Sequence, residues 1–582
     1  MSDTPDAPTL TLAPPPARRL EALWGLFGGT RPGSALPVRL FLRGLGAVYL
    51  FAFLPWAVQI LGVIGSEGVE PAGTFLQTVY AAEGLAGVLH YPSLAWISSS
   101  DAVLQAIPIA GIALALLLVV GYTNTLVLGS LWALYLSIVT ISGDYGLYGW
   151  SATLLEAGLL GLLLVPLRLT WRSTPVQAPP RLVVWAAWWL IFRLWFSMGV
   201  VKFYDGDPAW LRLTFLSHFY PNQPLPTPGA WLLAQLPMGV HKAAALVVAV
   251  VELAVPFLIF WNRKTRLAAA LIFAATSGFL FVSGHYAFFH LLVLLLCVLL
   301  LDAGHLHRLR SWLRAPKEAP PRPRAVRLAN AGAVPILLLG AFYLAALFLP
   351  GGRGPFNHLN YRVFDPVVLE KTSGLPLQGV AVGLLQTSAR FYLVNPIGEF
   401  KRIPRIRYEV VFEGSLDGET WLPYGFHDKP DDVDDAPAWT APYMDHLGTQ
   451  LYYEAQGLYF YRFDRRSDYD EGRPPRLLAL AERLRQGSPA VLRLLDEDPF
   501  EGRPPAFVRC SLYRFGFTDL GTLRREGAWW WREFEQLLLT NHPEGGASWH
   551  GPLLEPPLNG RVQTNLFDGQ RQGAQERPRR RP

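Results

Sequence analysis

Long apolar runs constrain the fold of this chain more than any other feature. A helix needs about 20 apolar residues to cross the hydrocarbon core of a bilayer. Runs of adequate length occur at 38–64, 102–120, 122–141, 152–168, 182–201, 243–261, 266–283, 286–302 and 332–350. The sequence therefore predicts a polytopic α-helical membrane protein with about nine transmembrane helices, of which the fourth is short enough to be re-entrant.

Composition excludes the other broad classes of protein. The 582 residues are 51% hydrophobic and 16% charged, with a mean hydropathy of +0.23, whereas a typical soluble domain is about 25% charged. These values exclude a soluble globular protein, a disordered chain and a fibrous repeat. The two cysteines, Cys297 and Cys510, exclude a disulfide scaffold and a four-thiolate zinc site. Arginine outnumbers lysine by 44 to 7, which suggests a GC-rich prokaryotic genome.

Basic residues beside the apolar runs predict the orientation. The N-terminal flank and the loops at 168–181, 261–266 and 303–327 are rich in Lys and Arg, whereas 65–101 has none. Basic loops stay in the cytoplasm, so nine spans with a cytoplasmic N-terminus place everything after the last span outside. The 202–242 segment, with three basic residues, is the exception. Most of the basic excess lies in short loops and in the terminal tail, so no nucleic-acid partner is expected.

The chain divides into four predicted parts. These are a disordered cytoplasmic tail (1–37), a multi-helix transmembrane domain (38–350), a β-rich C-terminal domain (356–540) and a flexible basic tail (541–582). In the β-rich part, apolar and polar residues alternate as in half-buried strands. Ile406, Tyr408, Val410 and Phe412 are expected to face the core, and Arg407, Glu409 and Glu413 the solvent. A second strand is predicted at 507–515, and a short helix is predicted to begin at Ser488-Pro489.

Motifs of known catalytic chemistry are missing from the sequence. It has no G-x-S-x-G elbow, H-E-x-x-H zinc helix, Walker A loop or C-x-x-C pair. We therefore predict no metal and no cofactor. The remaining candidates are ionisable groups within or beside the spans, which usually face a bundle interior or a cavity. They are Glu156, Arg193, Lys202, Glu252, His285 and His290.

Each candidate has a structural interpretation beside the functional one. Arg193 is expected to pair with Glu156 or Glu252, and Lys202 either snorkels to the membrane surface or carries chemistry. The two histidines flank a two-residue outer turn, where imidazoles bonded to backbone are favoured over a metal pair. A cluster of acidic residues is expected to be a solvated loop rather than a calcium site. It consists of Asp428, Asp431, Asp432, Asp434 and Asp435.

Several stretches taken together resemble the lipase maturation factor family. Those in the membrane half are Phe192–Lys202, Asp207–Trp210, His218–Tyr220, Asn222–Pro228, Glu252–Phe260 and Ser283–Leu301, and the C-terminal half adds Tyr408–Pro430, Asp498–Phe500 and Trp529-Trp530. The residues that carry the resemblance are Arg193, Trp210, His218, Gln223, Pro224, Glu252, His285, His290, Glu413, Gly414, Ser415 and Asp417. The order of the segments is more specific than any one of them.

This sequence departs from the family pattern at three places. The family's Cys-Trp-Arg is Ala209-Trp210-Leu211, its Asn residues near the seventh turn are His285 and His290, and its R-L-D-W-Q-M-W is replaced by residues 445–451. The C-terminal surface is therefore expected to recognise a different client, or one that is not a lipase.

The resemblance implies an integral membrane folding or maturation factor, without enzymatic activity, that acts as a chaperone for secreted proteins. Eukaryotic members lie in the endoplasmic reticulum membrane and bind dimeric lipases through a lumenal C-terminal domain. Here the equivalent place is the bacterial cytoplasmic membrane, with that domain outside and a secreted or periplasmic client. Trp421, Tyr424, Phe426 and Lys429 are the expected client-binding residues. In the alternative interpretation the three aromatic residues belong to the core.

A second function comes from another resemblance. The membrane half is distantly similar to the helical module of vitamin K-dependent carboxylase, in which a Lys after a Gly-containing span, followed by a Trp, carries chemistry. Lys202 and Trp210 match loosely, which suggests an enzyme acting on a quinone or lipid with Lys202 as base. An apolar wall and an unpaired Lys202 favour this enzyme. A Lys202 that faces solvent or is paired with a carboxylate, for which Asp205 and Asp207 are the nearest candidates, favours the maturation factor when the C-terminal domain also exposes an aromatic patch.

Overall fold

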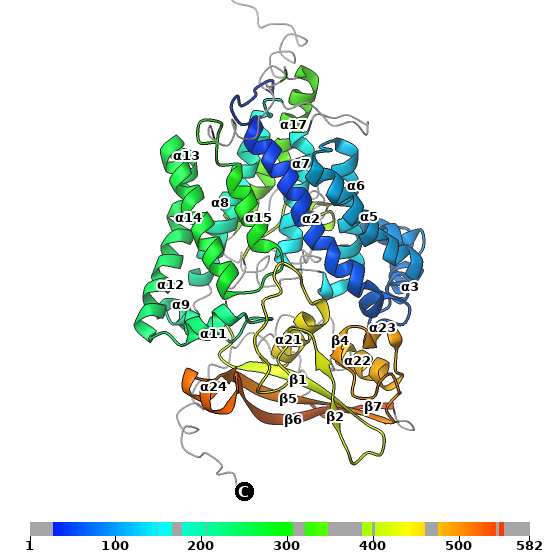
Figure 1. Cartoon of the computed structure of the whole chain (residues 1–582). Coiled ribbons are helices and arrows are strands. Elements are labelled where there is room, and N and C mark those ends of the chain that lie inside the picture. Colours follow the sequence, from blue (N-terminus) through cyan, green and yellow to red (C-terminus); the bar gives the residue numbers. More distant parts are fainter. Residues whose placement is uncertain are drawn as a thin grey trace, which may run out of the picture.

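The fold is that of a computed structural model, in which a helical bundle stands on a β-sheet domain (Figure 1). The structure describes residues 27–146, 148–165, 177–204, 207–306, 319, 322–346, 348, 387–398, 402–459, 475–542 and 546–551. Statements about the fold refer to these residues.

Nine apolar helices in the described ranges coincide with the nine predicted runs. Six of them are long and apolar enough to cross a membrane: α2 (Ala35–Ile64), α5 (Asp101–Val120), α8 (Arg181–Tyr204), α12 with α13 (Met238–Leu253 and Leu258–Trp261), α14 (Arg263–Ser283) and α17 (Pro323–Ala346). Three are shorter: α6 (Thr125–Ile141), α7 (Gly149–Leu164) and α15 (Phe289–Val298). A polytopic helical protein is thus confirmed, whereas the number of nine membrane crossings stays a prediction.

Local sequence signals explain where several of these helices begin and end. The Asn124 side chain accepts a hydrogen bond from the Val127 amide at the start of α6. Asn262 and Thr265 form a capping box at the start of α14. Helix α5 ends at Gly121, whose φ of 112° is readily adopted only by glycine. Short motifs between the apolar runs therefore mark where these helices begin and end.

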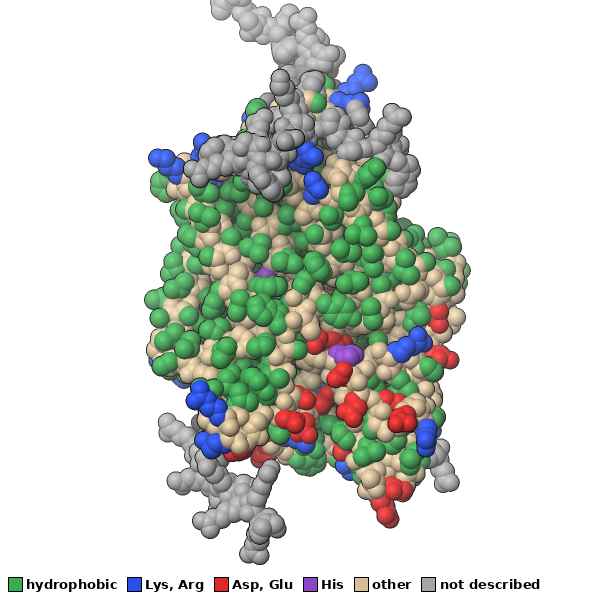
Figure 2. Space-filling view, viewed as in Figure 1, with side chains coloured by type: hydrophobic (Ala, Val, Ile, Leu, Met, Phe, Trp, Pro, Cys, Tyr) green, Lys and Arg blue, Asp and Glu red, His purple; other side chains and the backbone are tan. Residues whose placement is uncertain are grey.

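Hydrophobic side chains form a broad band around the helical bundle (Figure 2). Large apolar residues that are exposed there include Val58, Ile109, Val247, Leu271 and Leu338. In Figure 2 basic side chains appear both above and below this band, whereas the acidic side chains in view lie in the lower half of the molecule. Such a band is costly in water and is what a bilayer requires.

The C-terminal domain contains a five-stranded antiparallel sheet. Its strand order is β2 (Leu422–Pro423), β1 (Arg407–Ser415), β5 (Phe507–Phe517), β6 (Trp530–His542) and β7 (Gly546–Trp549). A two-stranded sheet pairs β3 (Gly425–Phe426) with β4 (Leu495–Glu497). The helices are α21 (His446–Tyr459), α22 (Pro475–Arg485), α23 (Pro489–Leu492) and α24 (Leu520–Glu526). Helices α21, α22 and α23 lie between the five-stranded sheet and the bundle (Figure 1).

Both predicted strands and the predicted short helix are present. The Ser488 side chain caps α23 by accepting from the Val491 amide, with Pro489 in the first turn. The expected half-burial of the 406–413 strand is wrong, because Arg407 and Glu409 are buried. Their side is covered by a loop of the bundle and by Lys429, so the strand is enclosed on both faces.

Two predicted tail boundaries also need correction. Residues 27–37 belong to the folded structure: the Arg31 amide donates to Pro179 O at 2.9 Å, and Asn330 donates to Phe27 O and Gly29 O. At the other end, β6 and β7 carry the sheet past residue 540. The rest of both predicted tails, and residues 356–386, lie outside the described residues.

Short helices connect the bundle to the domain below it. They are α3 (Ala72–Glu83), α4 (Ala86–His90), α9 (Pro208–Leu211), α10 (Phe215–Phe219) and α11 (Pro228–Ala234). The sheet and the loop before α14 lie at opposite ends of the molecule (Figure 1). An ion pair of 2.7 Å between Arg263 and Asp302 places the chain after α15 at the same far end.

Candidate functional site

An ion pair inside the bundle joins α7 to α8. Arg193 pairs with Glu156, and both side chains are almost fully buried. The Arg193 guanidinium also donates to Asn395 O at 3.0 Å, and the Asn395 amide donates to the second oxygen of Glu156 at 3.0 Å. The predicted pair is present, and Glu156 rather than Glu252 is the partner. Asn395 was missed, because it lies in a segment assigned to the other domain and no pattern marks it.

Lys202 does not snorkel, and that alternative is wrong. Its side chain is buried, pairs with Glu252 of α12, and lies with its ammonium 4.8 Å from the centre of the Trp210 ring. Asp207, one of its expected partners, instead pairs with Arg405 and caps α9 through the Ala209 amide. The other expected partner, Asp205, lies outside the described residues. The pairing of Lys202 matches the expectation for the maturation factor, whereas the apolar side chains beside it match the expectation for the enzyme.

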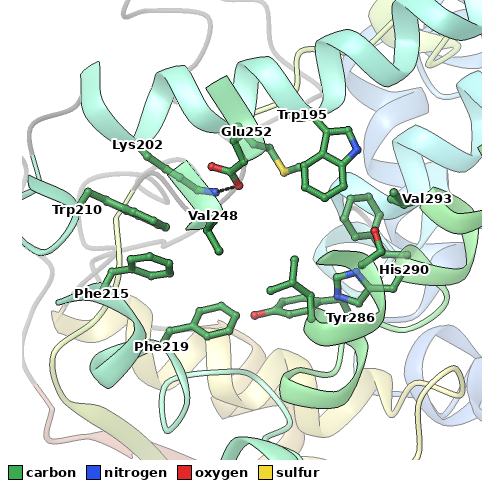
Figure 3. A pocket seen from close by; sticks show the side chains of 14 residues that line it. Trp195, Lys202, Trp210, Phe215, Phe219, Val248, Glu252, Tyr286, His290 and Val293 are labelled. Atoms are coloured by element: carbon green, nitrogen blue, oxygen red, sulfur yellow. Dashed lines mark hydrogen bonds and ion pairs between the residues drawn. The ribbon is translucent and has the colours of Figure 1, made fainter. Parts of the chain in front are cut away.

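A cavity of about 50 Å³ lies beside this pair in the bundle (Figure 3). Its walls include six aromatic residues, Trp195, Trp210, Phe215, Phe219, Tyr286 and Phe289. In Figure 3 Lys202 and Glu252 lie on one side of the space and His290 on the opposite side. Four helices supply its polar lining residues: α8 (Lys202), α12 (Glu252), α14 (Ser277) and α15 (His290). Packing brings together residues that are distant in the sequence.

The loop that carries the strongest part of the resemblance joins the two halves. The Arg407 guanidinium of β1 donates to Pro221 O at 2.8 Å, to Gln223 O and to Pro224 O at 3.1 Å. The Gln223 side chain donates to Ser283 O at 2.5 Å, which fixes the loop to the end of α14. Gln223 and Pro224 therefore support the junction between the halves.

The histidines take structural positions. His285 and His290 are buried in the bundle, and the expected bond to backbone is present at His285, whose Nδ1 accepts from the Ala287 amide at 3.4 Å. The expected two-residue turn is wrong, because the connection from α14 to α15 runs from Gly284 to Phe288, with His285 inside it and His290 in α15. His218 lies in α10, and its carbonyl oxygen accepts from the Asn222 side chain at 2.9 Å. No group of three or more His, Cys, Asp or Glu among the described residues is arranged to hold a metal ion.

The Glu-Gly-Ser-x-Asp-Gly stretch forms the turn from β1 to β2. Ser415 Oγ accepts from the Gly418 amide, and Asp417 accepts from the amides of Glu419 and Thr420 at 2.8 Å. These backbone hydrogen bonds lower the pKa of Asp417 to about 2. Two further motif residues act on the same strand. Glu413 pairs with Arg509 at 2.7 Å, and a side chain at Gly414 would meet the Phe500 ring.

The four predicted client-binding residues are mostly core residues. Tyr424 and Phe426 are 1% and 4% exposed, as the core alternative required, and Lys429 is 3% exposed. Trp421 is partly exposed and lies under the Arg509 guanidinium at 4.3 Å. Tyr424, Phe426 and Lys429 nevertheless line an open groove of about 690 Å³.

Acidic residues dominate the lining of this groove. They are Glu413, Asp428, Asp431, Asp432, Asp434, Asp435, Asp496 and Glu497. Asp435 accepts from the amides of Asp431 and Asp432 at 2.7 Å, so part of the acidic stretch is a backbone-bonded loop. Burial raises the pKa of Asp431 to about 6, against the opposing effect of the Lys429 ammonium. Sequence reasoning placed these residues on a loop but not around a groove.

Comparisons with known proteins cover both halves of the chain. The family model described as "Lipase maturation factor transmembrane domain" matches residues 36–308, and that described as "Lipase maturation factor C-terminal domain" matches 393–540. Lipase maturation factor 2 of Gallus gallus is 29% identical, with 90% of this chain and 84% of the relative covered. Lipase maturation factor 2 of Homo sapiens is 29% identical, with 86% and 82% covered. Lipase maturation factor 1 of Bos taurus is 30% identical, with 85% and 86% covered. No solved structure matches the chain at a significant level.

Proposed function

Because the chain belongs to the lipase maturation factor family, we propose that it is an integral membrane maturation factor that binds secreted clients through its C-terminal domain. The names of the relatives support lipases as the client class. The relatives align over more than four fifths of both chains, so the proposal draws on both halves and not on a shared membrane domain alone.

The observation that carries client binding is the open groove of the C-terminal domain. Its volume of about 690 Å³ accommodates a peptide segment. Exposed carboxylates at Asp434, Asp496 and Glu497 favour a client segment that carries basic residues. The stretch 421–430, expected from the sequence to contact the client, contributes eight residues to the lining.

Capture of a client by the full chain tests this proposal. The full-length protein is co-expressed with a secreted dimeric lipase, and both the lipase retained on the purified protein and its specific activity are measured. The triple variant Asp434→Asn, Asp496→Asn, Glu497→Gln is expected to reduce capture about tenfold, because interface charges control association. A matched variant neutralises three exposed carboxylates outside the groove, Glu419, Glu501 and Glu526, and is expected to leave capture unchanged. Equal capture by the two variants would refute the groove as the client site.

We also propose that the C-terminal domain lies outside the cytoplasmic membrane of a bacterium. The charge bias of the loops supports this orientation, as does the position of the sheet at the end opposite the basic 261–266 loop (Figure 1). Thr420 and Lys264 are exposed at these two ends, and the native cysteines are buried. A membrane-impermeant thiol reagent is expected to label Thr420→Cys in intact cells and Lys264→Cys only after lysis. The reverse pattern would overturn the orientation.

The apolar side chains beside Lys202 fit the alternative function, an enzyme with Lys202 as base, but its ion pair with Glu252 does not. The ion pair therefore gives Lys202 a structural role in the proposed function.

A further inference from the structure

We infer that the cavity between α8, α12, α14 and α15 is a binding site for a small neutral hydroxylated ring, that is, a phenol, either free or at the end of a lipid-soluble molecule. The inference is independent of client binding by the C-terminal domain. It rests on the shape of the cavity and on the polar atoms that face it.

Four buried polar atoms of the lining residues have no hydrogen-bond partner among the described residues. One is the indole Nε1 of Trp195, which is a donor, and the other three, which are able to accept, are Glu252 Oε2, Ser277 Oγ and His290 Nε2. Each of these side chains is at least 95% buried. An unsatisfied buried polar atom costs about 1–3 kcal/mol, so several around one cavity indicate a group that binds there. Glu252 Oε2 is the strongest acceptor of the three, because its carboxylate is charged.

The charge of the lining requires a neutral ligand with a donor. Lys202 and Glu252 form an ion pair, so the pair has no net charge to attract an ion. A hydroxyl group is able to donate to Glu252 Oε2 while remaining uncharged. The ligand class is therefore an alcohol or a phenol, and not a phosphate, a carboxylate or an amine.

The aromatic walls and the volume of the cavity favour a ligand that contains a ring. Aromatic side chains line the space on several sides, and flat rings pack well against them in stacked or edge-on geometry. A water needs roughly 10–15 Å³ of such space and occupies about 30 Å³ in the liquid. The cavity of about 50 Å³ thus corresponds to about three to five waters, which together have the size of a molecule of about seven non-hydrogen atoms. Phenol has this size, and a predominantly apolar wall offers few partners to a water cluster.

Fluorine NMR of the detergent-solubilised full chain tests the inference with two probes of the same shape. The first is 4-fluorophenol, and the second is 4-fluorotoluene, in which a methyl group replaces the hydroxyl. We expect 4-fluorophenol to bind with at least about threefold to tenfold higher affinity, the range of one net hydrogen bond. Equal broadening of the two fluorine signals would mean partition into detergent and would overturn the inference.

Two neighbouring valines of α12 provide a matched pair of variants. Val248 lines the cavity, whereas Val247 is 60% exposed on the bundle surface. Val248→Phe is expected to abolish 4-fluorophenol binding by filling the space, and Val247→Phe is expected to leave it unchanged. Binding that persists in a folded Val248→Phe protein would overturn the inference.

A third variant keeps the inference testable if Val248→Phe does not fold. Ser277→Ala removes one of the four unpartnered polar atoms and little volume, and it is expected to weaken 4-fluorophenol binding about twofold to tenfold. Unchanged binding in this variant would count against the site. A longer probe, 4-heptylphenol, distinguishes the two sources. Competition by this probe identifies the ring of a lipid-soluble molecule, and failure to compete identifies a free phenol.

Discussion

Two buried lysines, one in each half of the molecule, are neutralised in different ways. Lys429 of the C-terminal domain donates to Val410 O at 2.9 Å and to Pro430 O at 3.3 Å, and it pairs with Asp431. Glu409 Oε2 lies 3.7 Å from the same ammonium group. Acceptors and negative charge thus surround Lys429 within its own domain.

The lysine of the helical bundle has a simpler environment. Lys202 pairs with Glu252 and lies over the Trp210 ring, and the second carboxylate oxygen of Glu252 has no hydrogen-bond partner among the described residues. Unlike Glu409 Oε2, this oxygen faces a cavity. The comparison shows that a buried charge alone does not indicate a functional site. The informative feature is a buried polar atom that lies beside a cavity and has no hydrogen-bond partner.

The largest effect is expected from a substitution that breaks the junction between the two halves. Arg407→Met removes donors from the carbonyl oxygens of Pro221, Gln223 and Pro224 and leaves Glu409 with only the more distant ammonium group of Lys429. Loss of one partner of a buried pair costs about 3–5 kcal/mol. We expect little folded protein, measured as the monodisperse fraction after solubilisation.

Arg509→Met is the control for this prediction. Its pair with Glu413 is partly exposed, so its loss is expected to cost at most about 1 kcal/mol. If both variants unfold at the same temperature, buried and exposed pairs contribute equally here, and the comparison of the two halves loses its basis.

A smaller loss of stability is expected inside the bundle. Two variants of the Arg193–Glu156 pair test how a buried charge there is neutralised. Arg193→Met leaves the buried carboxylate of Glu156 with only its Asn395 contacts and is expected to cost about 3 kcal/mol. Adding Glu156→Gln removes the charge and is expected to restore at least half of the lost stability. Thermal unfolding of the single and double variants in one detergent measures both. A double variant less stable than Arg193→Met would show that the Glu156 carboxylate is stabilising by itself.

The smallest expected effect concerns pH and the C-terminal domain. Asp445 accepts from the amides of Leu447 and Gly448, and burial together with Asp428 raises its pKa to about 8. Below about pH 8 the folded protein holds a proton that the unfolded chain loses near pH 4, so this group makes stability fall as pH rises from about 4 to 8.

Asp445→Asn removes this titration while keeping an acceptor for the helix start. The variant is expected to match the wild type at pH 5 and to be more stable than the wild type at pH 9. Unfolding temperatures at the two pH values provide the measurement. A variant that keeps the pH dependence of the wild type would assign that dependence to other groups.

Short-range patterns were sufficient for much of the fold. The nine apolar runs coincide with nine helices, and the alternation at 507–515 lies within β5. The cap at Ser488 lies where the sequence indicated. The same patterns failed at Arg407 and Glu409, which alternation assigned to solvent. Alternation reports two faces of a strand, but it does not report what covers the second face.

The sequence by itself determined the nine apolar helices and their order, two strands and one short helix of the C-terminal domain, and the family. Only the tertiary structure decided which charges meet, since Lys202 and Glu252 are 50 residues apart and Arg193 and Asn395 are 202 apart. It also decided that the tyrosine and phenylalanine of the expected client loop are core residues, and that a cavity remains beside Glu252. Hydrophobic periodicity and composition reflect interactions over a few residues. Which charged side chains pair, and where a cavity remains, depends on how the helices and the sheet pack.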